Sequence, residues 1–199
     1  MTNKDKIHPR LSAFINVAYN IGVNQKTIFS ASTIIFFLMV SVGFGQEDNP
    51  LLSIRILEKP NPQELEVQCP ANKGVWNEIK LTRGQMTVNG KAQTTTSWGN
   101  PASSVKIKTG NLTRIYPGQI QISTSPGEKD VEFLILNRVP LLDYAACVAA
   151  FESGHDPSQP EYLKALGVLV RYYALSHRKR HPGYDLCDLS HCQVYQGMP

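Results

Sequence analysis

The sequence lacks the short motifs that identify several large enzyme classes. It contains no G-x-S-x-G segment, no P-loop and no G-x-G-x-x-G segment, so it indicates neither a nucleophile-elbow hydrolase nor a nucleotide-binding fold of these kinds. His155 lies three residues after Glu152, but the two do not form the H-E-x-x-H pattern of zinc metalloproteases. No internal repeat is visible. The chemistry must therefore be sought in less common groupings of residues.

The chain also has little excess charge. Charged residues make up 18% of the sequence and hydrophobic residues 42%, which excludes wholesale disorder. The net charge of +4 does not indicate a nucleic-acid partner. Basic residues cluster only at residues 178–180, between His177 and His181. This run is either a solvated helix end or a surface that attracts an anionic polymer.

No apolar run is long enough for an ordinary membrane span, which needs about 20 residues. Residues 27–45 carry no charge, but their continuously apolar core is only residues 34–40. Lys26 precedes the run, and the small residues Gly43 and Gly45 lie near its end. A basic flank, an apolar centre and a small-residue exit form the pattern of a signal peptide.

We therefore predict that residues 1–45 are a signal peptide and that the mature chain begins near Gln46. The region before the apolar run is long for a signal peptide, so a translation start downstream, near Val23, is an alternative to Met1. The alternative is an uncleaved anchor formed by residues 27–45, which would then be the chain's only membrane contact. Both alternatives predict an extracytoplasmic protein, either secreted, periplasmic or wall-associated. In such an oxidising compartment the four cysteines could form disulfides in three pairings: Cys69, Cys147, Cys187 and Cys192.

Residues 51–137 have the alternating pattern of β-strands. The segments with this pattern are separated by turn residues such as Asn89-Gly90, which predicts a type I′ hairpin. Residues 93–104 are polar and contain Gly and Pro, so we expect a loop there. The predicted strands are 51–58, 64–69, 76–82, 85–89, 104–108, 112–116, 119–123 and 131–136.

Helical periodicity replaces this pattern after Pro140. Residues 141–153 and 160–180 have apolar residues at helical spacing, and Pro160 suits a helix start. The cations of residues 178–180 suit a helix end, where they complement the helix dipole. Strands followed by helices predict an α+β fold with a β-rich N-terminal half, two helices and a loop that contains Cys and His.

The closing loop contains His181, Cys187, His191 and Cys192, spaced H-x5-C-x3-H-C. Two thiolates and two imidazoles are a donor set that zinc accepts in a tetrahedron. The spacing is not that of a zinc finger. A disulfide between Cys187 and Cys192, with surface histidines beside it, is the alternative.

Glu152 ends the alanine-rich first helix. Partial burial of a carboxyl group at this position would raise its pKa towards the range that suits a general acid. The alternative is a glutamate that is exposed to water at a helix end.

Four segments together resemble one known family. "YPGQIQI", "LNRVPLLDYAACVAAFES", "PEYLKALGVLVRYYALS" and "HPGYDLCDLSHCQVYQG" occur in the order seen in the stage II sporulation protein D / LytB family. The resemblance covers about residues 112–197, and the last segment is its most specific part. Residues 51–110 carry little signal of their own. The resemblance therefore predicts a β-rich upstream region at 46–110 and a sporulation protein D-like domain at 111–199.

The resemblance implies a peptidoglycan lytic transglycosylase, which cleaves the MurNAc–GlcNAc bond of denuded glycan strands and forms 1,6-anhydro products. It places the catalytic glutamate at Glu152, after the upstream motif Asp143-Tyr144. It also implies sugar contacts by Arg171 and Tyr172. The zinc ligands of some members fall on the four residues of the closing loop, so the implied cofactor is a structural zinc ion.

Other members are described as non-catalytic wall-binding proteins that enhance a cell-wall amidase, which is the alternative function. Family members usually continue beyond "CQVYQG" with a further helix and a Ser-containing segment. The resemblance therefore also predicts a domain of which only the N-terminal part is present, either as an inactive fragment or as a site that a second chain completes. The expected partners are glycan strands and a cell-wall amidase, with no nucleic acid.

Overall fold

The computed structural model describes residues 49–199, with the exception of 60, 71–73, 128–129 and 155–157. The predicted signal peptide, the predicted mature start at Gln46 and His155 therefore lie outside the described residues. The fold described below is that of the unit Leu51–Pro199. In the described part of the chain, no helix combines the length and apolarity that crossing a membrane requires.

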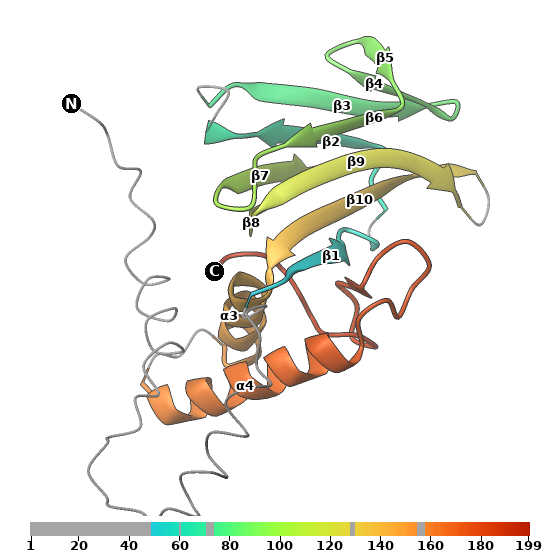
Figure 1. The fold of residues 1–199 in the computed structure, drawn as a ribbon. Coiled ribbons are helices and arrows are strands. Elements are labelled where there is room, and N and C mark those ends of the chain that lie inside the picture. Colours follow the sequence, from blue (N-terminus) through green and yellow to red (C-terminus); the bar gives the residue numbers. More distant parts are fainter. Residues whose placement is uncertain (1–48, 60, 71–73, 128–129, 155–157) are drawn as a thin grey trace, which may run out of the picture. The chain divides into compact units, whose positions relative to one another are not determined.

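Two β-sheets form most of this unit (Figure 1). The strand order is β11-β1-β10-β9-β6 in one sheet and β5-β4-β3-β2-β7-β8 in the other. The strands are β1 (Leu51–Arg55), β2 (Glu64–Gln68), β3 (Trp76–Thr82), β4 (Gln85–Val88), β5 (Lys91–Gln93), β6 (Thr95–Trp98), β7 (Ser104–Thr109), β8 (Leu112–Pro117), β9 (Gln119–Pro126), β10 (Val131–Pro140) and β11 (Leu186–Cys187).

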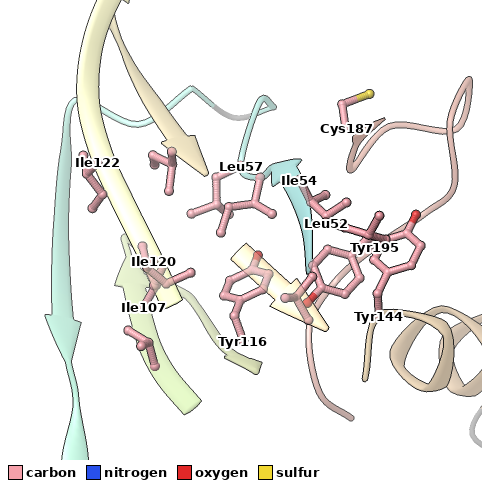
Figure 2. Packing of buried hydrophobic residues seen from close by; sticks show 14 of the residues in the cluster. Leu52, Ile54, Leu57, Ile107, Tyr116, Ile120, Ile122, Tyr144, Cys187 and Tyr195 are labelled. Carbon is pink, nitrogen blue, oxygen red and sulfur yellow. The ribbon is translucent and has the colours of Figure 1, made fainter. Parts of the chain in front are cut away.

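The sheets form because every second residue is apolar and buried in most of their strands. Leu52 and Ile54 of β1, like Ile120 and Ile122 of β9, are buried while their neighbours in the chain are more exposed. Figure 2 shows Ile120, Ile122 and Ile107 of β7 within one core. Burying one such side chain contributes about 1.5–3 kcal/mol. The period of two thus determines which face of each sheet is removed from water.

Most predicted strands are confirmed, and so is the Asn89-Gly90 hairpin. Asn89 and Gly90 have φ angles of 48° and 76°, and Val88 pairs with Lys91 across the turn. The expected loop at residues 93–104 is wrong in part, because β6 lies inside it and pairs antiparallel with β9. The strand forms although its residues are polar, because Trp98 at its end is buried in the core.

Two helices follow the strands, which confirms the α+β fold. Helix α3 (Leu141–Glu152) begins directly after β10 and packs against β10, β1 and α4. Helix α4 (Pro160–Ser176) has Pro in its first turn and ends four residues before the predicted end. It stops there because the chain turns: Lys179 has a φ of +59°, which no α-helix accommodates.

The C-terminal segment returns to both sheets. The Met198 amide donates to the Ile115 carbonyl of β8 over 2.7 Å. The buried Tyr195 hydroxyl donates to Asn137 Oδ1 of β10 over 2.7 Å. The Asn137 side-chain amide in turn donates to the carbonyls of Pro117 and Gln119. These bonds fix the chain that follows the Cys/His loop to the centre of the fold.

The Tyr195–Asn137 bond makes a stability prediction. Tyr195→Phe would leave the buried Asn137 oxygen without this donor, and an unsatisfied buried acceptor costs about 1–3 kcal/mol. We expect urea unfolding to show a loss in that range. The control is Tyr162→Phe, because Tyr162 is 50% exposed and its change should leave stability unaltered. Equal stabilities of the two variants would contradict the assignment.

Gly118 and Gly110 provide a second, matched prediction. Both have positive φ angles, but a Cβ atom on Gly118 would collide with the Arg138 carbonyl, whereas one on Gly110 would meet nothing within 4 Å. Gly110→Ala should therefore cost only the ~1–2 kcal/mol of a left-handed L-residue. Gly118→Ala should cost clearly more, measured as thermal and urea unfolding midpoints. A similar loss of stability in both variants would contradict this prediction, because it would show that the Arg138 backbone moves away from a Cβ atom at position 118 at no cost.

Candidate metal centre and neighbouring carboxylate

The loop after α4 is held in place by β1, which lies more than a hundred residues earlier in the sequence. β11 pairs in parallel with β1, with Ile54 opposite Leu186 and Arg55 opposite Cys187. Asp185 exchanges two bonds with Ser53: its amide donates to the Ser53 carbonyl, and its carboxylate accepts from the Ser53 amide, both over 2.8 Å. The N-terminal strand thus positions the residues on either side of Cys187.

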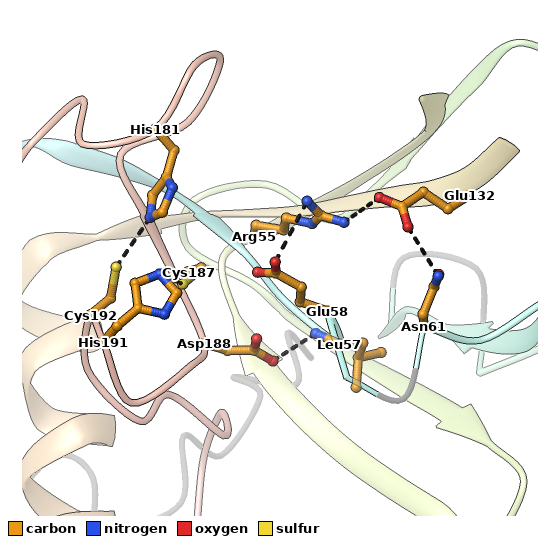
Figure 3. A network of polar contacts seen from close by, with 10 residues as sticks. All are labelled: Arg55, Leu57, Glu58, Asn61, Glu132, His181, Cys187, Asp188, His191 and Cys192. Atoms are coloured by element: carbon orange, nitrogen blue, oxygen red, sulfur yellow. Dashed lines mark hydrogen bonds and ion pairs between the residues drawn. The ribbon is translucent and has the colours of Figure 1, made fainter. Parts of the chain in front are cut away.

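Asp188 continues this attachment one residue beyond β11. Its carboxylate accepts a 2.7 Å hydrogen bond from the Leu57 amide, as Figure 3 shows. Burial raises the pKa of Asp188, and the hydrogen bond from Leu57 opposes this change. Leu57 itself has a φ of +56°, so the chain leaves the extended conformation at the point where Asp188 binds it. The predicted strand at 51–58 therefore ends early, at Arg55.

The four predicted ligand residues come together in this loop. One nitrogen or sulfur atom from each of His181, Cys187, His191 and Cys192 lies within 4.8 Å of the other three. His181 Nε2 is 3.2 Å from Cys192 Sγ, and Cys187 Sγ is 3.3 Å from His191 Nε2. Ligands at zinc distances in a tetrahedron are about 3.3–3.8 Å apart. The cluster is therefore close to the geometry of a bound cation, and its donor set suits zinc.

The cysteines form no disulfide in the structure. All four are free and buried: Cys69, Cys147, Cys187 and Cys192. Cys69 and Cys147 lie outside the cluster and belong to the hydrophobic core. The alternative of a Cys187–Cys192 bridge is thus absent, and the two thiols instead face the two imidazoles (Figure 3).

The protonation states of the cluster fit a site that must lose protons to bind a cation. Burial, and then the neighbouring His191, lower the pKa of His181, which favours the neutral imidazole that a metal requires. Burial raises the pKa of the Cys187 thiol, so this thiol is protonated at neutral pH without a cation. A metal that binds here would release that proton.

Aromatic side chains and a charged network surround the cluster. His181 stacks on Tyr184 at 4.7 Å between ring centroids, and the Tyr173 hydroxyl donates to the His191 carbonyl over 3.2 Å. Arg55 pairs with Glu132 at 2.6 Å and with Glu58 at 3.8 Å. One sequence offers no signal for Arg55, Glu132 and Tyr173, because they come from β1, β10 and α4 and share no spacing with the cluster.

Glu152 is the last residue of α3, and its side chain is exposed. Of the two alternatives, the structure shows the glutamate that is exposed to water at a helix end, although Ala145, Ala149 and Ala150 of the same helix are buried. Tyr144, on the same helix, is within electrostatic reach of both Glu152 and the cluster. Burial raises the Tyr144 pKa, and electrostatic interaction with neighbours that include Cys192, Cys187 and Glu152 adds to this effect.

Arg171 and Tyr172, the two predicted sugar contacts, lie in the middle of α4. Arg171 is half-buried, whereas Tyr172 is 71% exposed. Helix α4 turns Leu163, Val170 and Ala174 towards the core, so Tyr172 projects from its opposite side. No described contact joins Tyr172 to Glu152.

Comparison with known protein families gives a match in the C-terminal part of the chain. Residues 129–199 match the family model described as "Stage II sporulation protein". This range contains both helices, Glu152 and the complete Cys/His cluster. A search of curated proteins and a search of solved structures returned no match.

Proposed function

We propose, from the match of residues 129–199 to the stage II sporulation protein family model, that the chain is an extracytoplasmic lytic transglycosylase that cleaves peptidoglycan. The family match relates the chain to the cell wall and to sporulation. The substrate of the proposal is the MurNAc–GlcNAc bond of denuded glycan strands. The observation that carries the proposal is the position of Glu152 at an exposed helix end within the matched segment, where a polymer can reach it.

A single carboxyl group suffices for this reaction because its two proton transfers are sequential. Glu152 as the acid protonates the glycosidic oxygen while the bond from that oxygen to C1 of MurNAc breaks, and the GlcNAc end leaves as an alcohol. The resulting carboxylate then takes the proton of the C6 hydroxyl group, whose oxygen bonds to C1 of the same sugar. Water is not consumed, and Glu152 returns to its protonated state. Ordinary glycosidases need a second carboxylate because they must also activate water or form a covalent intermediate.

The Cys/His cluster has a structural role in this proposal. His181, Cys187, His191 and Cys192 would hold one zinc ion, which supplies folding energy rather than reaction chemistry when all four positions are protein ligands. The ion would join the loop after α4 to β11, and through β11 to β1. The loop is also bonded to both helices, because the Tyr144 hydroxyl donates to Gln193 Oε1 and the Tyr173 hydroxyl donates to the His191 carbonyl.

A non-catalytic amidase enhancer is the second candidate, and a feature of α4 favours it. The outer side of α4 exposes large apolar residues that suit a protein contact: Tyr162, Val168, Leu169, Tyr172 and Leu175. Such a protein would bind glycan and a partner amidase without cleaving the strand. Its glycan affinity would be unaffected by the charge of Glu152.

Incubation of the chain with denuded glycan strands separates the two candidates. We expect mass spectrometry to find new ends that carry 1,6-anhydro-MurNAc. Strands that are retained by the protein in a pull-down but remain uncut would instead support the enhancer. Strands that are neither cut nor retained would contradict both.

A further inference from the structure

A basic pocket lies beside the Cys/His cluster, at the start of β1. Its volume is about 480 Å³, and its lining includes Arg138, Arg178, Lys179, Tyr184 and Asp185. His181 also lines it, so the pocket adjoins the cluster. The walls come from β1, β10 and the turn after α4, three elements that the sequence does not bring together.

The charges in this pocket do not balance. Arg138, Arg178 and Lys179 contribute three cations, and Asp185 is the one carboxylate of the lining. Asp185 is already engaged: it accepts from the amides of Ser53 and Lys179, and Arg178 Nε is 3.7 Å away. Among the described residues, neither the Arg138 guanidinium nor the Lys179 ammonium group takes part in an ion pair. Two cationic groups therefore remain available to an anion.

The backbone conformation of Lys179 indicates that its side chain has a function. Lys179 has a φ of +59°, a left-handed conformation that disfavours every residue with a Cβ atom and that glycine usually occupies after a helix. Hydrogen bonds to Asp185 hold the backbone there, from the amides of Lys179 and Arg180. A glycine would satisfy these bonds with less strain. Lysine thus occupies a position at which glycine would make the fold more stable.

The ligand that fits is a carboxylate on a flexible, polar chain. The pocket is open and cationic, which suits one anionic group of a polymer rather than an enclosed small molecule. In a glycan strand this group is the lactyl carboxylate of MurNAc. It is an uncharged amide while the stem peptide is attached, and hydrolysis of that amide makes it an anion.

We propose that Arg138 and Lys179, with Arg178 beside them, bind the free lactyl carboxylate of MurNAc and thereby select denuded strands. This inference rests on the proposed glycan substrate. It gives the basic run at residues 178–180 a definite role, since Arg178 and Lys179 face the pocket while Arg180 Nη1 donates to the Tyr173 hydroxyl over 2.7 Å. The selected sugar would lie at the start of β1, in a pocket that Glu152 does not line.

The test is a binding assay with the 199-residue chain in a Glu152→Gln background, so that no strand is cut. One glycan is denuded strands, and the other is the same strands with their lactyl carboxylates converted to methylamides by carbodiimide and methylamine. We expect about tenfold tighter binding of the denuded strands, the lower range for a hydrogen bond to a charged group. Lys179→Gly and Arg138→Gln should each remove most of this difference without weakening binding of the amidated strands.

Arg83→Gly is the matched control. Arg83 is an exposed cation with a φ of +50° outside the pocket, so its change removes the same charge and the same backbone strain. It should leave the tenfold preference intact. Lys179→Gly should also keep or raise the unfolding midpoint, which separates lost binding from unfolding.

The outcomes are distinguishable. Equal affinity of the unsubstituted pocket for denuded and amidated strands would overturn this inference and leave the proposed function standing. A loss of preference in Arg83→Gly as large as that in Lys179→Gly would overturn it as well, because net charge alone would then be responsible. Absence of binding to either glycan would overturn both the inference and the proposed function.

Discussion

Glu152→Gln is expected to reduce the formation of anhydro-MurNAc ends by at least about 10²-fold, since general acid–base catalysis contributes typically 10²–10⁴-fold. Glutamine has nearly the shape of glutamate, but it can neither donate the first proton to the glycosidic oxygen nor accept the second from the C6 hydroxyl. Both steps of the proposed reaction therefore fail together. Because the Glu152 side chain is exposed at the end of α3, the substitution should change the free energy of unfolding by less than about 0.5 kcal/mol.

The matched control for this prediction is Glu161→Gln. Glu161 is an exposed glutamate in the first turn of α4, paired with Lys164 over 2.7 Å, and a surface pair of this kind contributes little. Its replacement removes the same charge near the same pair of helices and should preserve cleavage. If Glu152→Gln cleaved glycan as fast as Glu161→Gln, Glu152 would not be the acid.

Removal of the metal is the second large effect that we expect. The chain should bind one zinc ion, and chelation should lower the unfolding midpoint, because a ligand that binds only the folded state stabilises it by about 2.7 kcal/mol at a free concentration of a hundred times its Kd. Cys192→Ser should abolish stoichiometric zinc binding, since it removes one of the two thiols from the cluster. Zinc content and the midpoint would be measured on the same samples.

Cys69→Ser controls for the loss of a buried cysteine. Cys69 is buried in the core outside the cluster, so its change should affect stability but not zinc content. Affinity for zinc should also rise with pH up to neutrality, because the protonated Cys187 thiol must release a proton when the metal binds. Zinc content that did not differ between Cys192→Ser and Cys69→Ser would contradict the four-ligand site.

Local patterns predicted most of the fold. The alternation of apolar residues gave the strands, the Asn89-Gly90 pair gave its hairpin, and helical spacing gave α3 and α4. β6 was missed because its polar residues carry no alternation, and only the burial of Trp98 against β9 makes it a strand. A tertiary contact of this kind leaves no trace in a local window.

The sequence predicted which residues form the candidate site, but not the contacts that hold them in place. The spacing of His181, Cys187, His191 and Cys192 was sufficient to group them, and the structure brings them together. Their attachment to β1 through Asp185 and Asp188 depends on contacts that span about 130 residues, for which one sequence offers no signal. The exposure of Glu152 was one of two alternatives that the sequence left open, because an alanine-rich helix has no strongly polar side to indicate where it ends in water.

The most direct test of the account is to digest denuded glycan strands in ¹⁸O-labelled water and to determine the masses of the new MurNAc ends by mass spectrometry. A lytic transglycosylase closes the ring with the C6 oxygen of the sugar itself, so the account predicts ends that are one water molecule lighter than a reducing sugar and free of ¹⁸O. These ends should be absent with Glu152→Gln and present with Glu161→Gln. New ends that carry ¹⁸O would show hydrolysis and would contradict the proposed reaction.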